Sequence, residues 1–356
     1  MRISGWAALL VLGWVAAFAA LPDYPRVLPG RALSFPRDHG AHPEHRTEWW
    51  YVTGWLETNS GEPLGFQVTF FRSKPDIGQG NPSRFAPDQL LFAHAALSDP
   101  RIGYLIHEQR SARAGFGLAE AEQRDTDVHI DDWSLKRGTD DHYQISIKGR
   151  ELQFELTLVP TQPILLQGDA GYSRKGPLAS EASYYYSQPH LEVSGTESHD
   201  GHSRSVKGRA WIDHEWSSTM LAKEAVGWDW VGINLDDGGA LTAFRIRDSA
   251  GRALWTHASR RRGDGTKVAI AANAVNLVPI RRWRSPRTGA RYPVVMHVAV
   301  GDLSFDLVPL QDDQELDART STGNVYWEGA VTAVGGSKAL GRGYMELTGY
   351  FRPLRL

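Results

Sequence analysis

Two short segments of the chain combine ionisable side chains with large aromatic ones. Residues 45–51 (HRTEWWY) open a strand-like stretch, and residues 213–216 (DHEW) repeat the combination more weakly in mid-chain. Carboxyl, imidazole and indole groups in one patch are typical of an apolar pocket that carries a few polar groups at one end. Such a pocket can bind an apolar ligand or exchange protons with it.

Glu48 is the first candidate for an acid. On a strand, Glu48 and Trp50 share one face, while Trp49 and Tyr51 share the other. A carboxyl group beside Trp50 in an apolar cavity would have its pKa raised by desolvation, which suits a general acid. The alternative is that Glu48 forms an ion pair with Arg46, Arg72 or another basic residue at the rim of the barrel.

Asp229 stands between two indoles, those of Trp228 and Trp230. These neighbours would give its carboxyl group an apolar setting, so Asp229 is a second candidate acid. The alternative is an ordinary salt bridge at a strand edge. Asp213 and His214, from the mid-chain segment, complete this set of ionisable groups among aromatic residues.

Three histidines, His39, His42 and His45, follow one another at intervals of three. Imidazole groups suit zinc or iron. However, Gly40 and Pro43 would break any helix that placed the three rings on one face. We therefore expect a polar loop and no metal ion here, with His45 close to the aromatic residues that follow it.

The chain also contains an internal duplication. Residues 152–156 (LQFEL) match residues 303–307 (LSFDL), about 150 residues later. The other matches follow in nearly the same order: Trp133 with Trp283, Tyr143 with Tyr292, residues 99–107 with 248–257, residues 185–187 with 326–328, and residues 208–211 with 341–344. Each half has room for eight to ten short strands of the usual length.

His94 is a further candidate for proton transfer, because it lies in the otherwise apolar residues 91–97. A lone histidine in such a strand is more often a core or interface residue with a satisfied hydrogen bond. In the duplication its expected counterpart is Ala243, so the repeated fold would not require a histidine there.

Composition limits the classes of function. The chain has 356 residues, 41% of them hydrophobic and 22% charged, which is ordinary for globular proteins and long enough for two domains. A net charge of −2 gives no electrostatic case for nucleic acid as a partner. The absence of cysteine excludes disulfides, thiol catalysis and cysteine-based metal sites.

The N-terminus has the pattern of an export signal. Arg2 precedes an uncharged apolar run over residues 3–20, and residues 17–19 (AFA) resemble a signal peptidase site. We expect residues 1–20 to be a cleaved signal peptide, which would make the protein periplasmic or secreted, with no stable membrane span after cleavage. The alternative is an uncleaved membrane anchor, since the run is nearly long enough to cross a bilayer.

Alternating apolar and polar residues predict an all-β fold. Many short antiparallel strands that must protect their edges favour barrels, with a pair of sandwiches as the alternative. We predict two tandem antiparallel barrels, residues 21–208 and 209–356, packed against each other near residues 205–230. Each half ends in a glycine-containing aromatic strand, which could pair with its own first strand or bridge the halves.

Residues 45–54, 213–216, 227–230 and 235–238 resemble the lipocalin-like carotenoid 1,2-hydratase and AttH family. The resemblance covers nearly all of the chain after the signal peptide and implies two tandem lipocalin-like barrels. It also implies an apolar, isoprenoid-like ligand, because some relatives hydrate a terminal isoprenoid double bond. Residues 214–216 match the family's His-x-Trp element, whereas residues 242–248 (TAFRIRD) lack the Tyr-x-Asp element of the hydratases.

Two functions follow from these observations. The first is an enzyme that protonates an alkene of an apolar ligand and adds water, without a cofactor. The second is a non-enzymatic carrier of lipids or other apolar ligands. The predicted catalytic residues are Glu48, His94, Asp213, His214 and Asp229. The predicted ligand contacts are His45, Trp49, Trp50, Tyr51, Trp216, Trp228 and Trp230.

Overall fold

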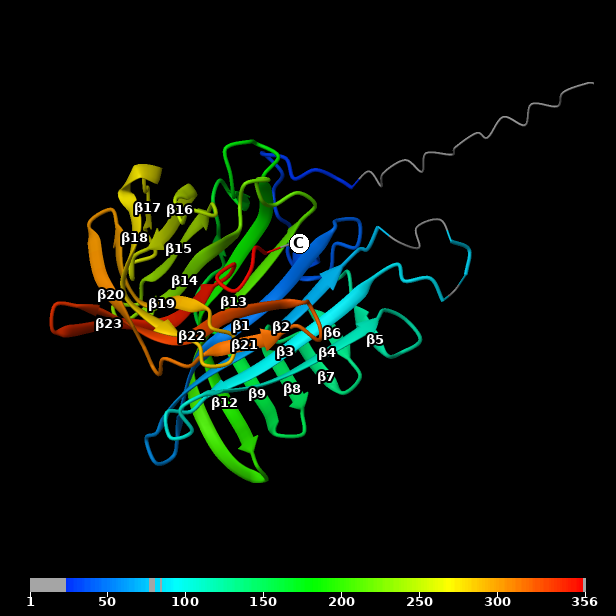
Figure 1. The fold of residues 1–356 in the computed structure, drawn as a ribbon. Helices are drawn as coiled ribbons and strands as arrows, with labels where there is room; N and C mark the ends of the chain where they lie inside the picture. Colours follow the sequence, from blue (N-terminus) through cyan, green and yellow to red (C-terminus); the bar gives the residue numbers. More distant parts are fainter. Residues whose placement is uncertain (1–23, 77–80, 84, 355–356) are drawn as a thin grey trace, which may run out of the picture.

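The structure is a computed structural model that describes residues 24–76, 81–83 and 85–354. It is built from two large antiparallel sheets, and the helical elements in the described ranges are two short 3-10 turns, η1 (Arg37–His39) and η2 (Ala272–Ala274). The predicted all-β fold is confirmed (Figure 1). No helix in the described ranges is long and apolar enough to span a bilayer. The predicted signal peptide lies outside these ranges.

The first sheet has thirteen strands in the described part of the chain. They are β1 (Thr47–Thr58), β2 (Pro63–Ser73), β3 (Leu90–Ser98), β4 (Leu105–Arg113), β5 (Ala119–Ala121), β6 (Asp127–Ile130), β7 (Trp133–Arg137), β8 (Tyr143–Lys148), β9 (Leu152–Pro160), β10 (Leu165–Leu166), β11 (Tyr172–Arg174), β12 (Ala182–His199) and β13 (His202–Ser217). The spatial order is β4-β3-β2-β1-β13-β12-β9-β8-β7-β6-β5, and β10 and β11 pair with β12.

The second sheet has ten strands among the described residues. They are β14 (Gly227–Leu235), β15 (Ala240–Arg247), β16 (Ala253–Arg261), β17 (Lys267–Val268), β18 (Val275–Arg284), β19 (Arg291–Val300), β20 (Leu303–Pro309), β21 (Glu315–Ala318), β22 (Asn324–Gly335) and β23 (Lys338–Leu347). The spatial order is β17-β16-β15-β14-β23-β22-β20-β19-β18, and β21 pairs with β22.

The first sheet nearly closes into a barrel. Gly115, just past β4, forms an isolated bridge with Ala119 at the start of β5. The carboxylate of Glu108 on β4 accepts the backbone N–H groups of residues 150–152 at 2.8 to 3.0 Å, at the β8–β9 turn. These contacts use polar groups that an open sheet edge would leave exposed.

The second sheet curls in a similar way. Strand β16 lies beside η2 and β18, on the far side of the sheet order. Arg245 on β15 reaches across and donates a hydrogen bond from Nη1 to the carbonyl oxygen of Leu277 on β18 at 2.9 Å. The two barrel-like bodies lie next to each other, with the blue-to-green first sheet at lower right of Figure 1 and the yellow-to-orange strands at upper left.

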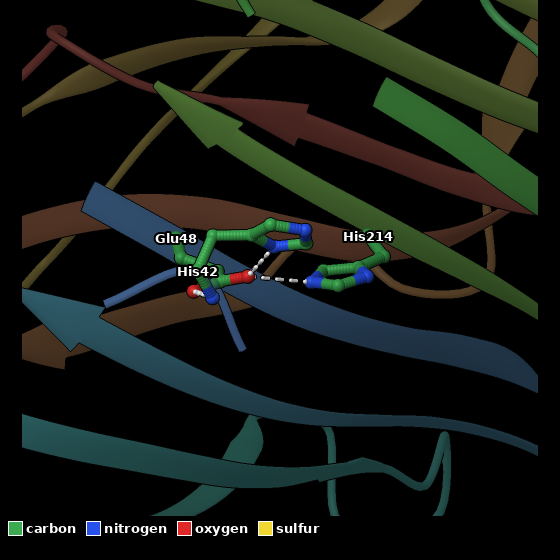
Figure 2. A group of neighbouring side chains, drawn as sticks. All are labelled: His42, Glu48 and His214. Carbon is green, nitrogen blue, oxygen red and sulfur yellow. Dashed lines mark hydrogen bonds and ion pairs between the residues drawn. The ribbon is translucent and has the colours of Figure 1, made fainter. Parts of the chain in front are cut away.

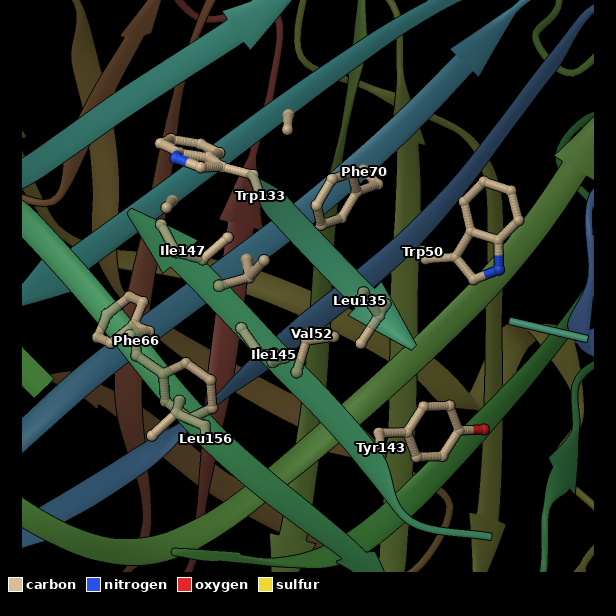
Figure 3. Close-up of a cluster of buried hydrophobic side chains, with 14 of the residues drawn as sticks. Trp50, Val52, Phe66, Phe70, Trp133, Leu135, Tyr143, Ile145, Ile147 and Leu156 are labelled. Carbon is tan, nitrogen blue, oxygen red and sulfur yellow. The ribbon is translucent and has the colours of Figure 1, made fainter. Parts of the chain in front are cut away.

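Apolar side chains fill the interior of the first barrel (Figure 3). Strands β8 and β9 alternate buried and solvent-facing residues, as expected for strands with one face on a core. Burial of each large apolar side chain contributes about 1.5–3 kcal/mol. The labelled side chains of this core are Trp50, Val52, Phe66, Phe70, Trp133, Leu135, Tyr143, Ile145, Ile147 and Leu156.

Strand pairing confirms most of the duplication. Strands β7, β8 and β9 carry Trp133, Tyr143 and residues 152–156, and strands β18, β19 and β20 occupy the corresponding places in the second sheet. Each closing aromatic strand pairs with the first strand of its own half, β13 with β1 and β23 with β14. Strand β13 crosses the predicted boundary between residues 208 and 209 and belongs to the first sheet, whereas the second sheet begins at Gly227.

One predicted match in the duplication is wrong. Because β15 pairs with β14 as β2 pairs with β1, strand β15 corresponds to β2 and not to β3. In the registers, His94 faces Thr69, which faces Tyr51. In the second sheet, His257 faces Phe244, which faces Trp230. The counterpart of His94 is therefore His257, and not Ala243, because the sequence match was shifted by one strand.

The two barrels meet along strands that are buried on both faces. In β1, residues 50–56 are all buried, and in β14 residues 229–235 are all buried, unlike the alternating strands β8 and β9. The outer faces form an apolar cluster between the sheets that includes Tyr51, Trp55, Trp211, Trp230 and Tyr344. This seam is where side chains of the two halves come together.

Candidate functional site

The end of the first barrel holds a network of buried ionisable groups (Figure 2). Glu48 on β1 lies between two imidazoles, and its Oε1 is 2.7 Å from His42 Nδ1 and 2.9 Å from His214 Nε2. His214 comes from β13, whose register sets it opposite Trp50. The three ionisable side chains have no exposed surface.

The charges of this network balance. His42 Nε2 is 3.0 Å from Asp38 Oδ1, so both ring nitrogens donate to carboxylates and the ring is an imidazolium. Arg72 Nε donates to Glu48 Oε2 at 2.8 Å. Burial opposes the charge of Glu48, but His42, Arg72 and a hydrogen bond from His214 outweigh it and hold the pKa of Glu48 well below its usual value. The expected rise in this pKa is wrong, and the alternative, an ion pair with Arg72, is confirmed.

Among the described residues, His42, Glu48 and His214 come closest to forming a metal site. Ligand atoms of His42, Glu48 and His214 lie within 4.8 Å of one another. The nitrogen–oxygen distances of 2.7 and 2.9 Å are, however, hydrogen-bond lengths. Arg72 binds the second carboxylate oxygen, and its charge would repel a cation. The arrangement therefore fits a proton-linked network better than a metal centre.

Residues 34–46 form an N-terminal plug across this end of the barrel. The carbonyl oxygen of His39 accepts hydrogen bonds from Trp50 Nε1 and Thr126 Oγ1, both at 3.0 Å. The ring of His42 stacks on the indole of Trp216, with ring centres 3.7 Å apart. Burial, with nearby positive charge, lowers the pKa of His39 to about 3. The predicted polar loop is thus a buried closure, and His45 is buried in it as well.

Asp229 is also held in a buried ionic cluster. Its carboxylate accepts hydrogen bonds from Arg245 Nε and Arg247 Nε, each at 2.9 Å, and from the Tyr350 hydroxyl at 2.8 Å. The residue has no exposed surface. The salt-bridge alternative is confirmed, although the bridge lies in the interior of the second sheet and not at a strand edge.

His94 lies at a contact between the two halves. Its Nε2 is 2.9 Å from the Ser321 hydroxyl, and its ring packs near Phe71 and Tyr326. Burial, with the charge of His107, lowers the pKa of His94 to about 3. The neutral ring thus fixes the β21–β22 turn to β3, as an interface histidine would.

A cavity opens along the seam, in two adjoining parts. The outer chamber has a volume of about 250 Å³ and the inner chamber about 40 Å³. The two share the side chains of Trp49, Tyr51, Trp228 and Glu346. The indoles of Trp49 and Trp228 are stacked, with ring centres 6.5 Å apart. The expected hollow among indoles therefore lies at the junction of the two barrels.

The outer chamber carries a pair of carboxyl groups. Glu328 on β22 lies directly opposite Glu346 on β23. Burial raises the pKa of Glu346 to about 8. Burial, and then the charge of Glu346, raise the pKa of Glu328 well above its usual value. Two neighbouring carboxyl groups titrate as a pair, and with both pKa values raised the pair keeps a proton at neutral pH.

A third acid belongs to the inner chamber. Asp213 lines it, and burial raises the pKa of Asp213 to about 7, although Trp211 Nε1 donates to its Oδ1 at 2.7 Å. The registers show that Asp213 and Glu346 are counterparts, because Asp213 faces Tyr51 and Glu346 faces Trp230. The duplication has therefore placed one acid from each half at the seam.

The structure distributes the predicted site residues over several places. Asp213 and the predicted contacts Trp49, Tyr51, Trp228 and Trp230 line the cavity. The barrel-end network contains Glu48, His214, Trp50, Trp216 and His45, and Asp229 lies inside the second sheet. Glu48 contributes to the wall of the outer chamber, but its carboxylate is sealed inside the barrel.

Sequence reasoning missed Glu328, Glu346 and Lys175, which line the cavity. Glu346 and Asp213 are counterparts on the two closing strands, β23 and β13, so this aligned pair of carboxyl groups was the available signal for Glu346. Glu328 corresponds to Ser187, which carries no carboxyl group, so the duplication gave no signal for Glu328. No pattern in the sequence singled out Lys175.

Comparison with known proteins gives the family. The model of the AttH-like family matches residues 26–350. A candidate AttH protein from Nitrosomonas europaea is similar in structure, with 52% sequence identity, a TM-score of 0.86, and coverage of 92% of this chain and 99% of that one. No curated protein matches the sequence at a significant level.

Two more distant structures share the fold. Kievitone hydratase from Nectria haematococca has 14% identity and a TM-score of 0.70, over 93% of this chain and 97% of its own. CghA, solved with Sch210972, has 15% identity and a TM-score of 0.51, over 86% and 89%. At these identities the likeness concerns the lipocalin-like fold. The family match over almost the whole chain, with the half-identical relative, shows that this protein belongs to the AttH-like family.

Proposed function

We propose that this protein binds an apolar ligand in the seam cavity and adds water to one of its carbon–carbon double bonds by acid catalysis. The observation that carries the proposal is the Glu328–Glu346 pair, which faces a chamber walled by Trp49 and Trp228. A general acid should keep its proton near the working pH, and a raised carboxyl pKa meets that condition.

The chemistry can be balanced with these two groups. The protonated carboxyl of Glu346 donates its proton to one alkene carbon, and the other carbon becomes a tertiary cation. Water then forms the carbon–oxygen bond and releases a proton to the carboxylate pair. Glu328 and Glu346 thereby return to their starting state, and the product is the ligand plus one water molecule.

Aromatic walls would stabilise the cation between these steps. The faces of Trp49 and Trp228 and the ring of Tyr51 border the chamber beside Glu346. An aromatic face contributes about 0.5–2 kcal/mol to a nearby cation, and more when water is excluded. The apolar lining, which also includes Phe71 and Phe92, suits a hydrocarbon body.

The comparisons support a hydration reaction only at the level of fold. Kievitone hydratase is named as a hydratase and shares the fold, with a TM-score of 0.70. The second candidate function, a carrier, is favoured by the same apolar lining and needs no proton donor. A carrier would have no reason to bury two facing carboxyl groups, which is costly without a compensating role.

The test uses short acyclic isoprenoid alkenes such as myrcene in water labelled with oxygen-18. The expected product is a tertiary alcohol with one labelled oxygen, detected by mass spectrometry. Glu346→Gln and Glu328→Gln should lower the rate by about 10²–10⁴-fold, the usual contribution of a general acid. The matched control is Glu192→Gln, on an exposed position of β12.

Two outcomes would contradict the proposal. Unchanged turnover in both glutamine variants would remove the acid pair from the reaction. If each of the tested isoprenoid alkenes is recovered bound to the protein without any labelled alcohol, the carrier function would be favoured.

A further inference from the structure

Lys175 lies in the inner chamber, and among the described residues it is the one lysine that lines the cavity. Its Nζ is 2.8 Å from Glu215 Oε1 and 3.1 Å from Ser173 Oγ. The same ammonium group lies 4.5 Å from the ring centre of Tyr185 and 4.2 Å from that of Phe244. The residue is only 5% exposed. A lysine this deep must be held for a reason other than solubility.

The hydrogen-bond inventory of Lys175 is incomplete. An ammonium group has three N–H donors. The described residues offer it two oxygen acceptors, Glu215 and Ser173, and otherwise two aromatic faces. The third N–H faces aromatic rings, which are weaker acceptors than oxygen, so an oxygen atom of a ligand in the chamber would be a better partner for it.

The size of the inner chamber limits what can supply that oxygen. Its volume of about 40 Å³ has room for only a few water molecules, since a cavity needs about 10–15 Å³ to hold one. A ring or a branched chain does not fit. A small terminal group does, provided that the rest of the ligand lies in the outer chamber, which adjoins it at Trp49 and Trp228.

The charge of the inner chamber selects among small terminal groups. Glu215 already balances the charge of Lys175. Asp213 and Glu346 also border the chamber, and their carboxyl groups would repel an added carboxylate whenever either one ionises. A cationic group on the ligand would be repelled by the ammonium group of Lys175. A neutral oxygen acceptor avoids both penalties, and a carbonyl oxygen is the strongest neutral acceptor of this size.

We infer that the inner chamber is a binding site for a carbonyl oxygen, which accepts a hydrogen bond from Lys175. The ligand of the proposed reaction is then an apolar molecule that ends in an aldehyde or ketone. Its hydrocarbon body occupies the outer chamber beside Glu346. This inference rests on the proposed function for the position of the body, and adds the class of ligand.

The test uses 4-(dimethylamino)cinnamaldehyde, a flat apolar aldehyde whose absorption moves to longer wavelength when a donor polarises its carbonyl group. The unmodified protein should bind it with such a shift, and tryptophan quenching should give the dissociation constant. Lys175→Met should abolish the shift and weaken binding at least tenfold. Lys223→Met, at an exposed position, is the matched control and should behave like the unmodified protein.

A second variant protects the test against misfolding. Lys175→Met leaves Glu215 buried without its partner, so the double variant Lys175→Met/Glu215→Gln removes both charges together. It should also bind the probe without the shift. A shift that persists in the double variant, or probe bound to the unmodified protein with an unshifted spectrum, would overturn the inference.

Two further results separate this inference from the proposed function. Covalent trapping of the probe on Lys175 by borohydride would show that Lys175 forms an imine with the carbonyl carbon. That result would overturn the inferred hydrogen bond to the carbonyl oxygen. Hydration of myrcene, which has no carbonyl group, tests the Glu328–Glu346 pair without involving the probe. The spectral shift therefore succeeds or fails independently of the hydration assay.

Discussion

Replacing Glu346 by glutamine should change how the stability of the protein depends on pH. An ordinary glutamate side chain ionises near pH 4.5, whereas in the folded protein burial raises the pKa of Glu346 to about 8. Between these two values the folded protein keeps a proton that the unfolded chain has released. The unfolded state binds fewer protons, so the free energy of unfolding falls as the pH rises through this window.

The size of the effect follows from one proton. A group that is protonated when folded and ionised when unfolded contributes about 1.4 kcal/mol per pH unit. Glu328 and Glu346 titrate as a pair, and the substitution removes one of their two carboxyl groups. Between pH 5.5 and 7.5, the variant should therefore lose about 3 kcal/mol less free energy of unfolding than the unmodified protein.

Urea denaturation followed by tryptophan fluorescence, at pH 5.5, 6.5 and 7.5, measures this difference. Each barrel carries several tryptophans, so the transition reports on both. Glu192→Gln on the exposed face of β12 is the control and should keep the slope of the unmodified protein. Equal slopes for the Glu346→Gln variant and the unmodified protein would refute the claim that Glu346 is protonated in the folded state at neutral pH.

Three other perturbations test the remaining buried charges. Glu48→Gln should destabilise the protein by about 3–5 kcal/mol in urea denaturation, because Asp38 still pairs with the imidazolium of His42 but the charge of Arg72 stays buried without a counter-charge, while turnover per folded molecule stays the same. Asp229→Asn should lower the melting temperature for the same reason, since Arg245 and Arg247 lose their partner; a variant as stable as the parent would contradict the assignment. Dialysis against a chelator should leave the melting temperature unchanged, because Glu48 is occupied by hydrogen bonds; a clear drop that zinc reverses would instead show a metal centre.

Local pattern predicted the faces of the strands well. The alternation in residues 48–51 predicted that Trp50 lies on one face and that Trp49 and Tyr51 lie on the other. In the structure the first face packs into the first core and the second lies at the seam. The period of a strand is a property of its own residues, so it can be read without knowing the neighbours. The duplication likewise predicted two β units, but it left open whether each closing strand pairs within its own half or bridges the halves.

The acid pair could not be predicted in the same way. Glu328 and Glu346 become neighbours only through the register of β22 and β23, and their carboxyl groups are desolvated by strands of the other barrel. The predicted rise in the pKa of Glu48 was wrong for a related reason. The positive charges that lower this pKa come from Arg72 and His42, which are not adjacent to Glu48 on its strand. A pKa depends on such assembled surroundings more than on adjacent residues.

The N-terminal plug can form only late in the synthesis of the chain. Its network joins Glu48 to His214, 166 residues further on, and Asp38 to His214 across 176 residues. At the usual speed of translation, about 5–20 residues per second, the imidazole of His214 emerges roughly 10 to 30 seconds after the residues that must bind it. During that interval the nascent first half carries its charges in water, and a chain stopped before β13 should remain open at this end.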